Sequence, residues 1–293
     1  MRISTSTGIC TTVLHRETRY FTCADALRAI AAAGFGGVDL CFVAFGRPGM
    51  PMAAENWREW VAGQKALADR LGLVTNQGHA HYYSAKDSYR YTAQDWDHAE
   101  SLIRRDIEAA GICGVPWLVV HPDSHLKDGN YSRSLSLETQ YARFSRLGEL
   151  AGKWNVGIAI ENMVDNNPIK RFGGSHEDLL ELLDRLGDDE RFGVCWDTGH
   201  ANLNQNDQPS AIRALGSRLR CLHVNDNHGK TDDHTLPFLG TVQWQGIMQA
   251  LKDIGYSGDF TYEIHRFTEG FTPAFYPWAL TFARETAEHL LTL

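Results

Sequence analysis

Four side chains of types that commonly bind metal ions stand at or near the ends of four apolar runs in this chain. Three are carboxylates and one is an imidazole: Glu161, Asp197, His223 and Glu263. If each run is a β-strand, each of these side chains lies at a carboxyl end. Such ends converge when parallel strands close into a barrel, and barrel enzymes build their sites there from several strands. The sequence therefore predicts a metal site before it predicts a substrate.

Short β-type runs alternate with amphipathic stretches from one end of the chain to the other. The expected strands are 2–6, 37–42, 73–78, 117–121, 156–161, 192–197, 219–224 and 259–264. The expected helices lie near 23–33, 55–71, 95–110, 136–153, 176–186, 209–216, 243–253 and 276–291. Alternating strands and helices favour right-handed crossovers and a parallel sheet, and eight such units in about 250 residues match a closed barrel. We therefore expect an α/β fold, a single (β/α)8 TIM barrel domain over residues 1–293, with an open doubly wound sheet as the alternative.

Composition and charge argue against several classes of protein. The net charge of −8 and the lack of a long basic run disfavour a nucleic-acid partner. No stretch approaches the roughly 18 apolar residues of a membrane helix, and the first residues do not resemble a signal peptide. We therefore expect a cytoplasmic protein without a membrane partner. The six cysteines form no Cys-x-x-Cys pair and are expected to be reduced core residues.

Three carboxylates and one imidazole suit a hard divalent cation. We expect one ion, with Mn²⁺ as the first choice and Mg²⁺, Co²⁺ or Zn²⁺ as alternatives. Such an ion can chelate two neighbouring oxygens of a sugar and stabilise the enediolate that forms when an adjacent carbon loses its proton. Carboxylates beside the ion then serve as base and acid for that proton. Histidines strengthen the pattern, because seven of the 13 lie on or after expected strand ends: His79, His81, His121, His200, His223, His234 and His265.

The motifs on the last four expected strands resemble one known family. They are Ile158-Ala-Ile-Glu-Asn162, Cys195-Trp-Asp-Thr-Gly-His200, Leu222-His-Val-Asn-Asp226 and Tyr262-Glu-Ile264. In that order and at those intervals they are similar to the xylose isomerase-like barrel superfamily. This superfamily includes ketose 3-epimerases, hydroxypyruvate isomerases, inosose-type isomerases and dehydratases, and endonuclease IV. The resemblance covers nearly the whole chain.

The sugar epimerases of this superfamily imply roles for eight residues. One metal ion would be held by Glu161, Asp197, His223 and Glu263. Glu161 and Glu263 would also exchange the proton. Contacts to the substrate would come from His79, His121, His200 and His234. The resemblance thus implies a metal-dependent isomerase or epimerase that acts on a small sugar, sugar acid or inositol derivative. We also expect a homo-oligomer.

Other activities stay open. Lyase chemistry, such as dehydration or cleavage of a C-glycoside, can use the same enediolate. The alternative from another class is a zinc-dependent endonuclease that acts at abasic sites, because the following segments look like further ligands of the endonuclease IV trinuclear zinc site: His79, His121, His200 and Asp232-Asp-His234. Against it, the loops after the second and third strands carry Arg47 and Arg90 but no basic cluster. A barrel that binds without catalysis should have lost a ligand, and all four are present.

Aromatic residues at expected loop positions favour a walled pocket for a small polyol or glycoside. They are Phe42, Phe45, Tyr82, Tyr83, Trp196, Phe238, Phe267 and Phe271. Sugar epimerases tend to carry an arginine a few residues beyond the histidine of the seventh strand. This chain has Asn227, His228, Gly229 and Lys230 in that region, so the identity of the substrate stays open.

Overall fold

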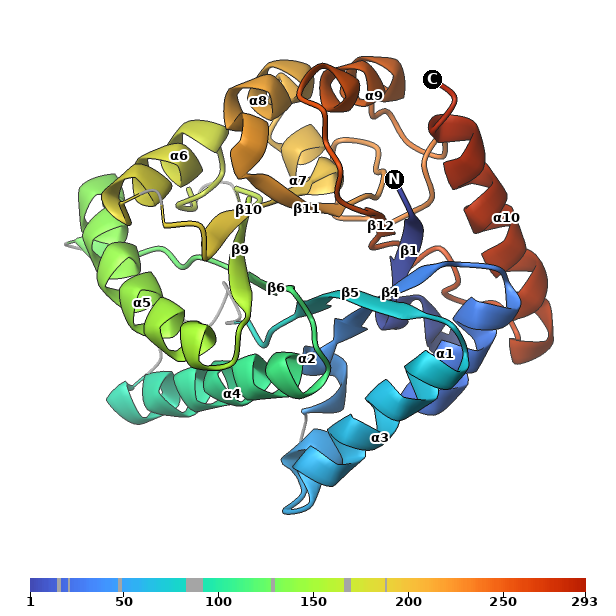
Figure 1. Ribbon diagram of the computed structural model, residues 1–293. Coiled ribbons are helices and arrows are strands. Elements are labelled where there is room, and N and C mark those ends of the chain that lie inside the picture. The colour runs from blue at the N-terminus through green and yellow to red at the C-terminus, as the bar shows by residue number, and fades with distance from the viewer. Residues whose placement is uncertain are drawn as a thin grey trace.

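The computed structural model describes residues 1–14, 17–20, 22–46, 49–82, 92–127, 130–165, 170–187 and 189–293. Eight parallel strands follow one another around a ring in the order β11-β10-β9-β6-β5-β4-β1-β12. Their bounds are β1 (Ile3–Ser6), β4 (Gly37–Cys41), β5 (Val74–His79), β6 (Trp117–Val120), β9 (Gly157–Glu161), β10 (Phe192–Asp197), β11 (Leu219–His223) and β12 (Phe260–Tyr262). The first and last strands in this order also meet, because Val224 N–H donates to Thr261 O at 2.8 Å and Glu263 N–H donates to Val224 O at 3.0 Å. The sheet therefore closes into a barrel (Figure 1).

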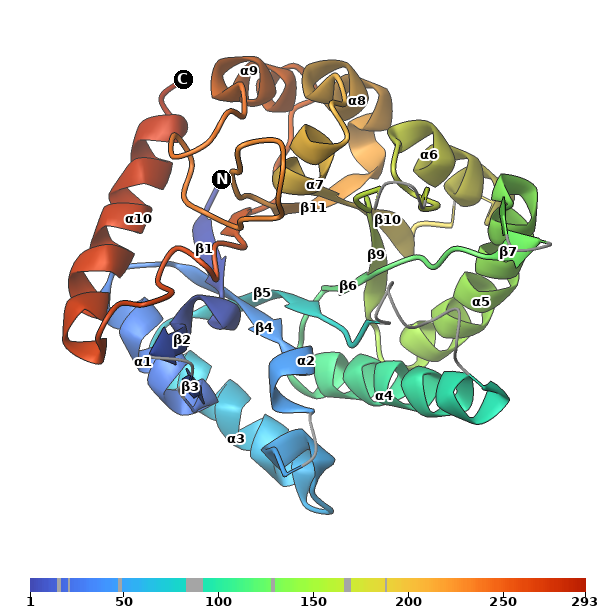
Figure 2. The same ribbon diagram turned by 180° about the vertical axis from the view of Figure 1, so that it is seen from behind.

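Helices surround the barrel on its outer side (Figures 1 and 2). The longer ones are α1 (Cys23–Ala32), α3 (Trp57–Arg70), α4 (Ala93–Ile112), α5 (Arg133–Lys153), α6 (His176–Arg185), α8 (Gln208–Leu215), α9 (Trp244–Asp253) and α10 (Tyr276–Leu290). Every expected strand and helix is present, with each end within three residues of the predicted one. The single (β/α)8 barrel is confirmed, and the open doubly wound sheet is wrong.

The structure also contains short elements that the hydrophobic pattern does not predict. Two short helices directly follow strands, namely α2 (Phe42–Phe45) after β4 and α7 (Thr198–Leu203) after β10. Two antiparallel ribbons pair β2 (Thr11–Leu14) with β3 (Glu17–Tyr20), and β7 (Leu126–Lys127) with β8 (Asn130–Tyr131). Among the described residues, the 3-10 turns are η1 (Thr7–Cys10), η2 (Pro51–Ala53), η4 (Gly216–Arg218) and η5 (Pro273–Phe275). Each of these elements is too short to show a reliable hydrophobic period.

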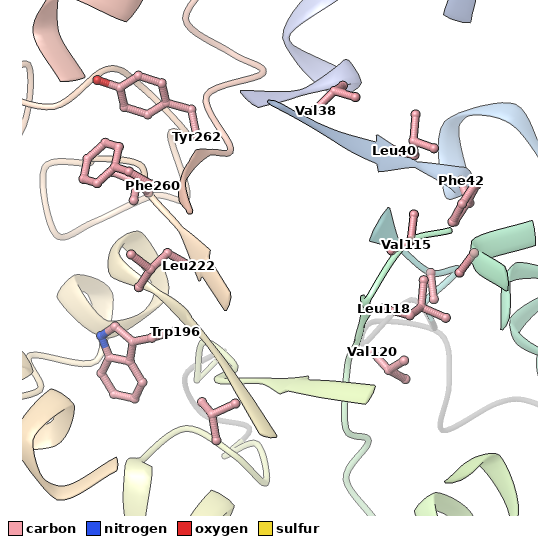
Figure 3. Close-up of a cluster of buried hydrophobic side chains, with 14 of the residues drawn as sticks. Val38, Leu40, Phe42, Val115, Leu118, Val120, Trp196, Leu222, Phe260 and Tyr262 are labelled. Atoms are coloured by element: carbon pink, nitrogen blue, oxygen red, sulfur yellow. The ribbon is translucent and has the colours of Figure 1, made fainter. Parts of the chain in front are cut away.

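The main hydrophobic core lies between the barrel and the helices. Figure 3 labels ten side chains of this layer: Val38, Leu40, Phe42, Val115, Leu118, Val120, Trp196, Leu222, Phe260 and Tyr262. Neighbouring residues on the same strands point to the other face, toward the barrel axis, because side chains alternate along a strand. Four of them form a separate small cluster: Val119, Ala159, Cys195 and Cys221. All six cysteines are free and five are buried, as the sequence predicts.

Three aromatic residues expected at the pocket wall lie in the main core instead, so that prediction is wrong for them. Trp196, Phe42 and Phe45 are buried there. Trp196 precedes Asp197 on β10, and because side chains alternate, the indole faces the helices when the carboxylate faces the barrel axis. The indole N–H donates to Gln208 Oε1 at 3.3 Å, which satisfies its polar group inside the core.

The other expected wall residues differ in exposure. Tyr82 and Phe238 are exposed, whereas Phe267 and Phe271 are partly buried against the core. Tyr83 lies outside the described residues. None of the helices in the described ranges is both long enough and apolar enough to cross a membrane.

Candidate metal centre

The four residues expected to bind a metal meet at the carboxyl ends of neighbouring strands. Glu161, Asp197 and His223 end β9, β10 and β11, and Glu263 directly follows β12. One potential ligand atom from each lies within 4.8 Å of those from the other three. All four residues are buried, and three of them have no exposed surface. The barrel thus gathers three carboxylates and one imidazole in a volume that suits a single cation.

His223 has carboxylates beside both of its ring nitrogens. Nδ1 lies 3.0 Å from Glu161 Oε1 and 3.6 Å from Glu263 Oε2, and Nε2 lies 3.2 Å from Asp39 Oδ2 on β4. Burial disfavours the imidazolium, but the charges of Glu263 and Glu161 outweigh it and raise the pKa of His223 well above its usual value. The metal-free ring is therefore protonated, and a cation would displace the proton on the nitrogen that faces the glutamates.

The three carboxylates of the centre differ in the direction of their pKa shifts. Burial alone would raise the pKa of Glu161, but the charge of His223 holds it well below its usual value. The same balance lowers the pKa of Glu263 to about 2, because burial is outweighed by His223 and His234. Burial raises the pKa of Asp197 to about 6, and the charges of Glu161 and Glu263 act in the same direction. Two ionised glutamates therefore face the same imidazole at neutral pH.

Asp197 is fixed by the turn that follows its strand. It is the N-cap of α7, where His200 N–H donates to Asp197 Oδ1 at 2.7 Å and Asn225 Nδ2 donates to Oδ2 at 2.8 Å. Asn162 holds the backbone of Asp197 on both sides: Asp197 N–H donates to Asn162 Oδ1 at 2.6 Å, and Asn162 Nδ2 donates to Asp197 O at 2.9 Å. The cap begins a short helix and places His200 in contact with the centre.

A second group of ligand-type side chains contains His79 and His121 and shares Glu161 with the four-residue centre. His121 Nε2 lies 2.8 Å from Glu161 Oε2, and His79 Nε2 lies 3.6 Å from the same oxygen. The His121 and Glu161 atoms are not aligned as a hydrogen bond, and neither has a hydrogen-bond partner among the described residues. Burial lowers the pKa of His121 to about 4, so its ring is neutral, which is the form that binds a metal. Two such buried, unpaired atoms at this separation fit a shared cation.

A third group consists of His200, Asp232 and His234. Asp232 Oδ2 lies 3.0 Å from His234 Nε2 and 3.6 Å from His200 Nε2. Burial opposes protonation of His234, but Glu263 and Asp232 outweigh it and raise its pKa to about 9. The ring of His265 stacks on that of His234 with their centroids 4.0 Å apart. The structure therefore brings all four histidines expected at the substrate into groups beside or continuous with the four-residue centre.

Backbone carbonyls fix the orientation of three of these rings. Nδ1 of His79 lies 2.8 Å from Ala80 O. Nδ1 of His200 lies 2.8 Å from Asn162 O, and Nδ1 of His234 lies 2.9 Å from Glu263 O. A carbonyl oxygen only accepts, so each Nδ1 carries a proton and Nε2 is the nitrogen that faces the carboxylates. Histidines that bind metals are commonly held in this way.

Asp39 is the residue of this site that the sequence analysis did not single out. It is fully buried on β4 and contacts His223. The available signal was an acid in the middle of the apolar run Gly37–Cys41. His81 joins none of the groups that could hold a metal among the described residues, and its Nδ1 pairs with Asp106 Oδ2 at 2.7 Å. Arg47 and Arg90, which bear on the nuclease alternative, lie outside the described residues.

The chain resembles known proteins along most of its length. The sequence profile of the family described as "Xylose isomerase-like TIM barrel" matches residues 27–290. The uncharacterized protein y4fM of Sinorhizobium fredii is 30% identical over 178 residues, which are 58% of this chain and 54% of that protein. A probable endonuclease 4 of Halorhodospira halophila is 28% identical over 232 residues, which are 70% of this chain and 75% of that protein. The chain thus spans about half the length of y4fM and three quarters of that endonuclease.

Solved structures show the same fold. A D-tagatose 3-epimerase-like protein superposes with a TM-score of 0.73 over 99% of this chain and 98% of its own, at 21% sequence identity. Similarity at that level of identity concerns the architecture and not the reaction. The family profile, which covers most of the chain, decides the relationship: the protein belongs to the xylose isomerase-like TIM barrel family.

Proposed function

We propose that the protein is a divalent-metal-dependent isomerase or epimerase of a sugar, a sugar acid or an inositol derivative. The observation that carries this proposal is the pair Glu161 and Glu263, two buried carboxylates that lie 3.0 and 3.6 Å from the same nitrogen of His223. Such a pair can serve as the base and the acid of a proton transfer to and from carbon. Membership of the xylose isomerase-like TIM barrel family agrees with this class of reaction.

The residues fit a divalent cation, which Glu161, Asp197, His223 and Glu263 would hold. When bound, the ion would polarise a substrate carbonyl and stabilise the enediolate that follows loss of the neighbouring proton. Glu161 and Glu263 have low pKa values before a metal binds, so both are available as ionised bases. The four buried or nearly buried histidines His79, His121, His200 and His234 would contact the hydroxyl groups of the substrate and keep water away from the reacting carbon.

The test is exchange of carbon-bound hydrogen with solvent. The protein loaded with Mn²⁺ is incubated in D₂O with a panel of ketoses, sugar acids and inososes, and deuterium incorporation next to the carbonyl is followed by NMR. We expect exchange with at least one compound, and we expect Glu263→Gln to abolish it while the circular dichroism spectrum stays the same. An active Glu263→Gln variant would sink the assignment. Dehydration or C-glycoside cleavage on the same enediolate would appear as a new product in the same spectra.

A second candidate is a metal-dependent endonuclease that acts at abasic sites. The observation that favours it is the presence of further groups of ligand-type side chains beside the four-residue centre, one of which shares Glu161 with it. Three zinc ions in such groups would suit phosphodiester cleavage. The similarity to the Halorhodospira halophila endonuclease 4 points in the same direction. Cleavage of a duplex that carries one abasic site, with strong dependence on salt, would support this candidate, and exchange of sugar protons without such cleavage would exclude it.

A further inference from the structure

We infer that Asp39 is a positioning residue for the metal-facing nitrogen of His223, and that a buried chain of hydrogen bonds across the barrel holds Asp39 in place. The inference rests on the proposed function, because it takes His223 as a metal ligand. Asp39 lies on β4, beside a centre whose other carboxylates come from β9, β10 and the end of β12. It is fully buried, and it belongs to none of the groups that could hold a metal among the described residues.

Asp39 and Glu161 contact opposite nitrogens of the same ring. Asp39 Oδ2 lies 3.2 Å from His223 Nε2, whereas Glu161 Oε1 lies 3.0 Å from Nδ1. A carboxylate only accepts hydrogen bonds, so Nε2 carries a proton that it donates to Asp39. In the singly protonated ring Nδ1 must then hold the lone pair, which points toward Glu161 and Glu263. Asp39 thus selects the form of His223 that can bind a cation between those glutamates.

Gln77 on β5 determines where Asp39 Oδ2 lies. Gln77 Nε2 donates to Asp39 Oδ2 at 3.1 Å and to Leu222 O at 3.3 Å. Both of these partners accept and cannot donate, so the amide nitrogen and not the amide oxygen must face them. One carboxylate oxygen of Asp39 therefore receives a hydrogen bond from Gln77 and one from His223. Gln77 therefore fixes the direction of the hydrogen-bond chain, in which the donors point toward Asp39.

The amide oxygen of Gln77 accepts a hydrogen bond from a hydroxyl group, which in turn accepts from two other side chains. Thr261 Oγ1 donates to Gln77 Oε1 at 3.1 Å. The same hydroxyl accepts from Ser4 Oγ at 2.7 Å and from Asn76 Nδ2 at 3.0 Å. Ser4, Gln77 and Thr261 are buried and come from three different strands, so the chain crosses the barrel interior. Polar residues on the inner face of a barrel cost desolvation unless their groups are paired. The hydrogen bonds above pair Asp39 Oδ2 and both ends of the Gln77 amide, whereas Asp39 Oδ1 and Asn76 Oδ1 have no partner among the described residues.

A carboxylate on the far nitrogen of a metal-binding histidine also makes the near nitrogen a stronger ligand. Loss of such a partner typically weakens metal binding about 10- to 100-fold. Asp39→Asn removes the negative charge and leaves an oxygen that can still accept from His223. The variant therefore tests the effect of the Asp39 charge while it keeps the shape of the side chain.

The experiment is titration of the full-length, chelator-treated protein with Co²⁺, followed by calorimetry and by the visible absorption of the bound ion. We expect Asp39→Asn to weaken Co²⁺ binding about 10- to 100-fold and to change the absorption bands. Gln77→Leu should weaken binding in the same direction but less, because Asp39 remains. Thr75→Val is the matched control: Thr75 is buried on the same strand, but its hydroxyl donates to Cys113 O at 2.9 Å and does not join the chain.

The outcomes separate this inference from the proposed function. Wild-type affinity in both Asp39→Asn and Gln77→Leu overturns the inference and leaves the proposed function intact. An equal loss in Thr75→Val also overturns it, because the effect would then reflect general damage to the barrel. A wild-type protein that binds no Co²⁺ overturns the proposed function together with the inference. The melting temperature of each metal-free variant, measured beside the titration, shows whether the fold is retained.

Discussion

Glu161 and His121 approach each other to 2.8 Å, between Oε2 and Nε2, without the alignment of a hydrogen bond. The other oxygen of the same carboxylate lies 3.0 Å from Nδ1 of His223. Glu161 is therefore the one side chain that belongs both to the four-residue centre and to the group with His79 and His121. Glu263 also belongs to further groups, but its oxygens lie 3.3 to 3.8 Å from the histidine nitrogens around them. The closer approach of Glu161 separates its expected role from that of Glu263.

Glu161→Gln and Glu263→Gln should differ in their effect on metal content. Each should lower the rate of proton exchange about 10²- to 10⁴-fold, because each removes a base. Glu161→Gln should also lose much more bound metal, since the two oxygens of Glu161 lie 2.8 and 3.0 Å from histidine nitrogens, whereas those of Glu263 lie 3.3 Å or more from theirs. Elemental mass spectrometry on the purified variants, beside the exchange assay, measures both quantities. Equal metal content in the two variants would contradict the shared role of Glu161.

The metal-free protein should lose stability as the pH rises above neutrality. The pKa of His234 is raised from 6.5 to about 9, so its contribution is complete below pH 6.5 and is lost as the pH rises through about 9. Urea unfolding of chelator-treated protein between pH 6.5 and about 9 measures the effect. His234→Asn should flatten the slope, and a free energy of unfolding that rises with pH would contradict the account.

Asn162→Ala should destabilise the fold and disturb the centre together. The asparagine makes two hydrogen bonds to the backbone of Asp197, at 2.6 and 2.9 Å, and alanine would leave those buried groups unpaired. We expect a loss of about 1–3 kcal/mol in the free energy of unfolding, together with weaker metal binding. Asn206→Ala is the matched control, because Asn206 is only partly buried and makes a single bond of 3.0 Å to Gly174 O. If Asn206→Ala lowered the free energy of unfolding as much as Asn162→Ala, the two hydrogen bonds to Asp197 would not explain the loss.

Trp196→Phe should change stability and leave substrate binding unaltered. The indole packs in the core behind the centre and donates to Gln208 Oε1, so the smaller ring leaves a void and an unpaired amide oxygen. We expect a cost of about 1–3 kcal/mol in the free energy of unfolding. The KM for the substrate identified by proton exchange should stay at its wild-type value. A raised KM in a stably folded variant would contradict this prediction and indicate that Trp196 lines the substrate pocket.

The barrel and the positions of its strands follow from the sequence because the signal is periodic. Glu161, Asp197, His223 and Glu263 stand out for the same reason, since each is a charged or polar residue at the end of an apolar run. The side on which a residue faces is harder to predict, because it depends on register. Trp196 and Asp197 are adjacent and point to opposite faces of β10, and the sequence analysis assigned both to the pocket.

Asp39 shows a second limit of the sequence. Its strand reads as an ordinary buried run, and its importance comes from His223, which is 184 residues away in the chain. The hydrogen bonds that link Asp39, Gln77 and Thr261 exist only because the barrel brings β4, β5 and β12 to one interior. No local pattern carries that information, since hydrogen-bond direction depends on which groups meet in space.

The most direct test of a metal-dependent isomerase is the number and identity of metal ions bound per chain. Elemental mass spectrometry would be applied to protein purified without chelators and without an affinity tag. The account predicts one Mn²⁺, Mg²⁺ or Co²⁺ ion per chain, bound by Glu161, Asp197, His223 and Glu263. A protein that carries no divalent ion, and binds none when it is supplied, would contradict the account. Three zinc ions per chain would contradict it in favour of the nuclease.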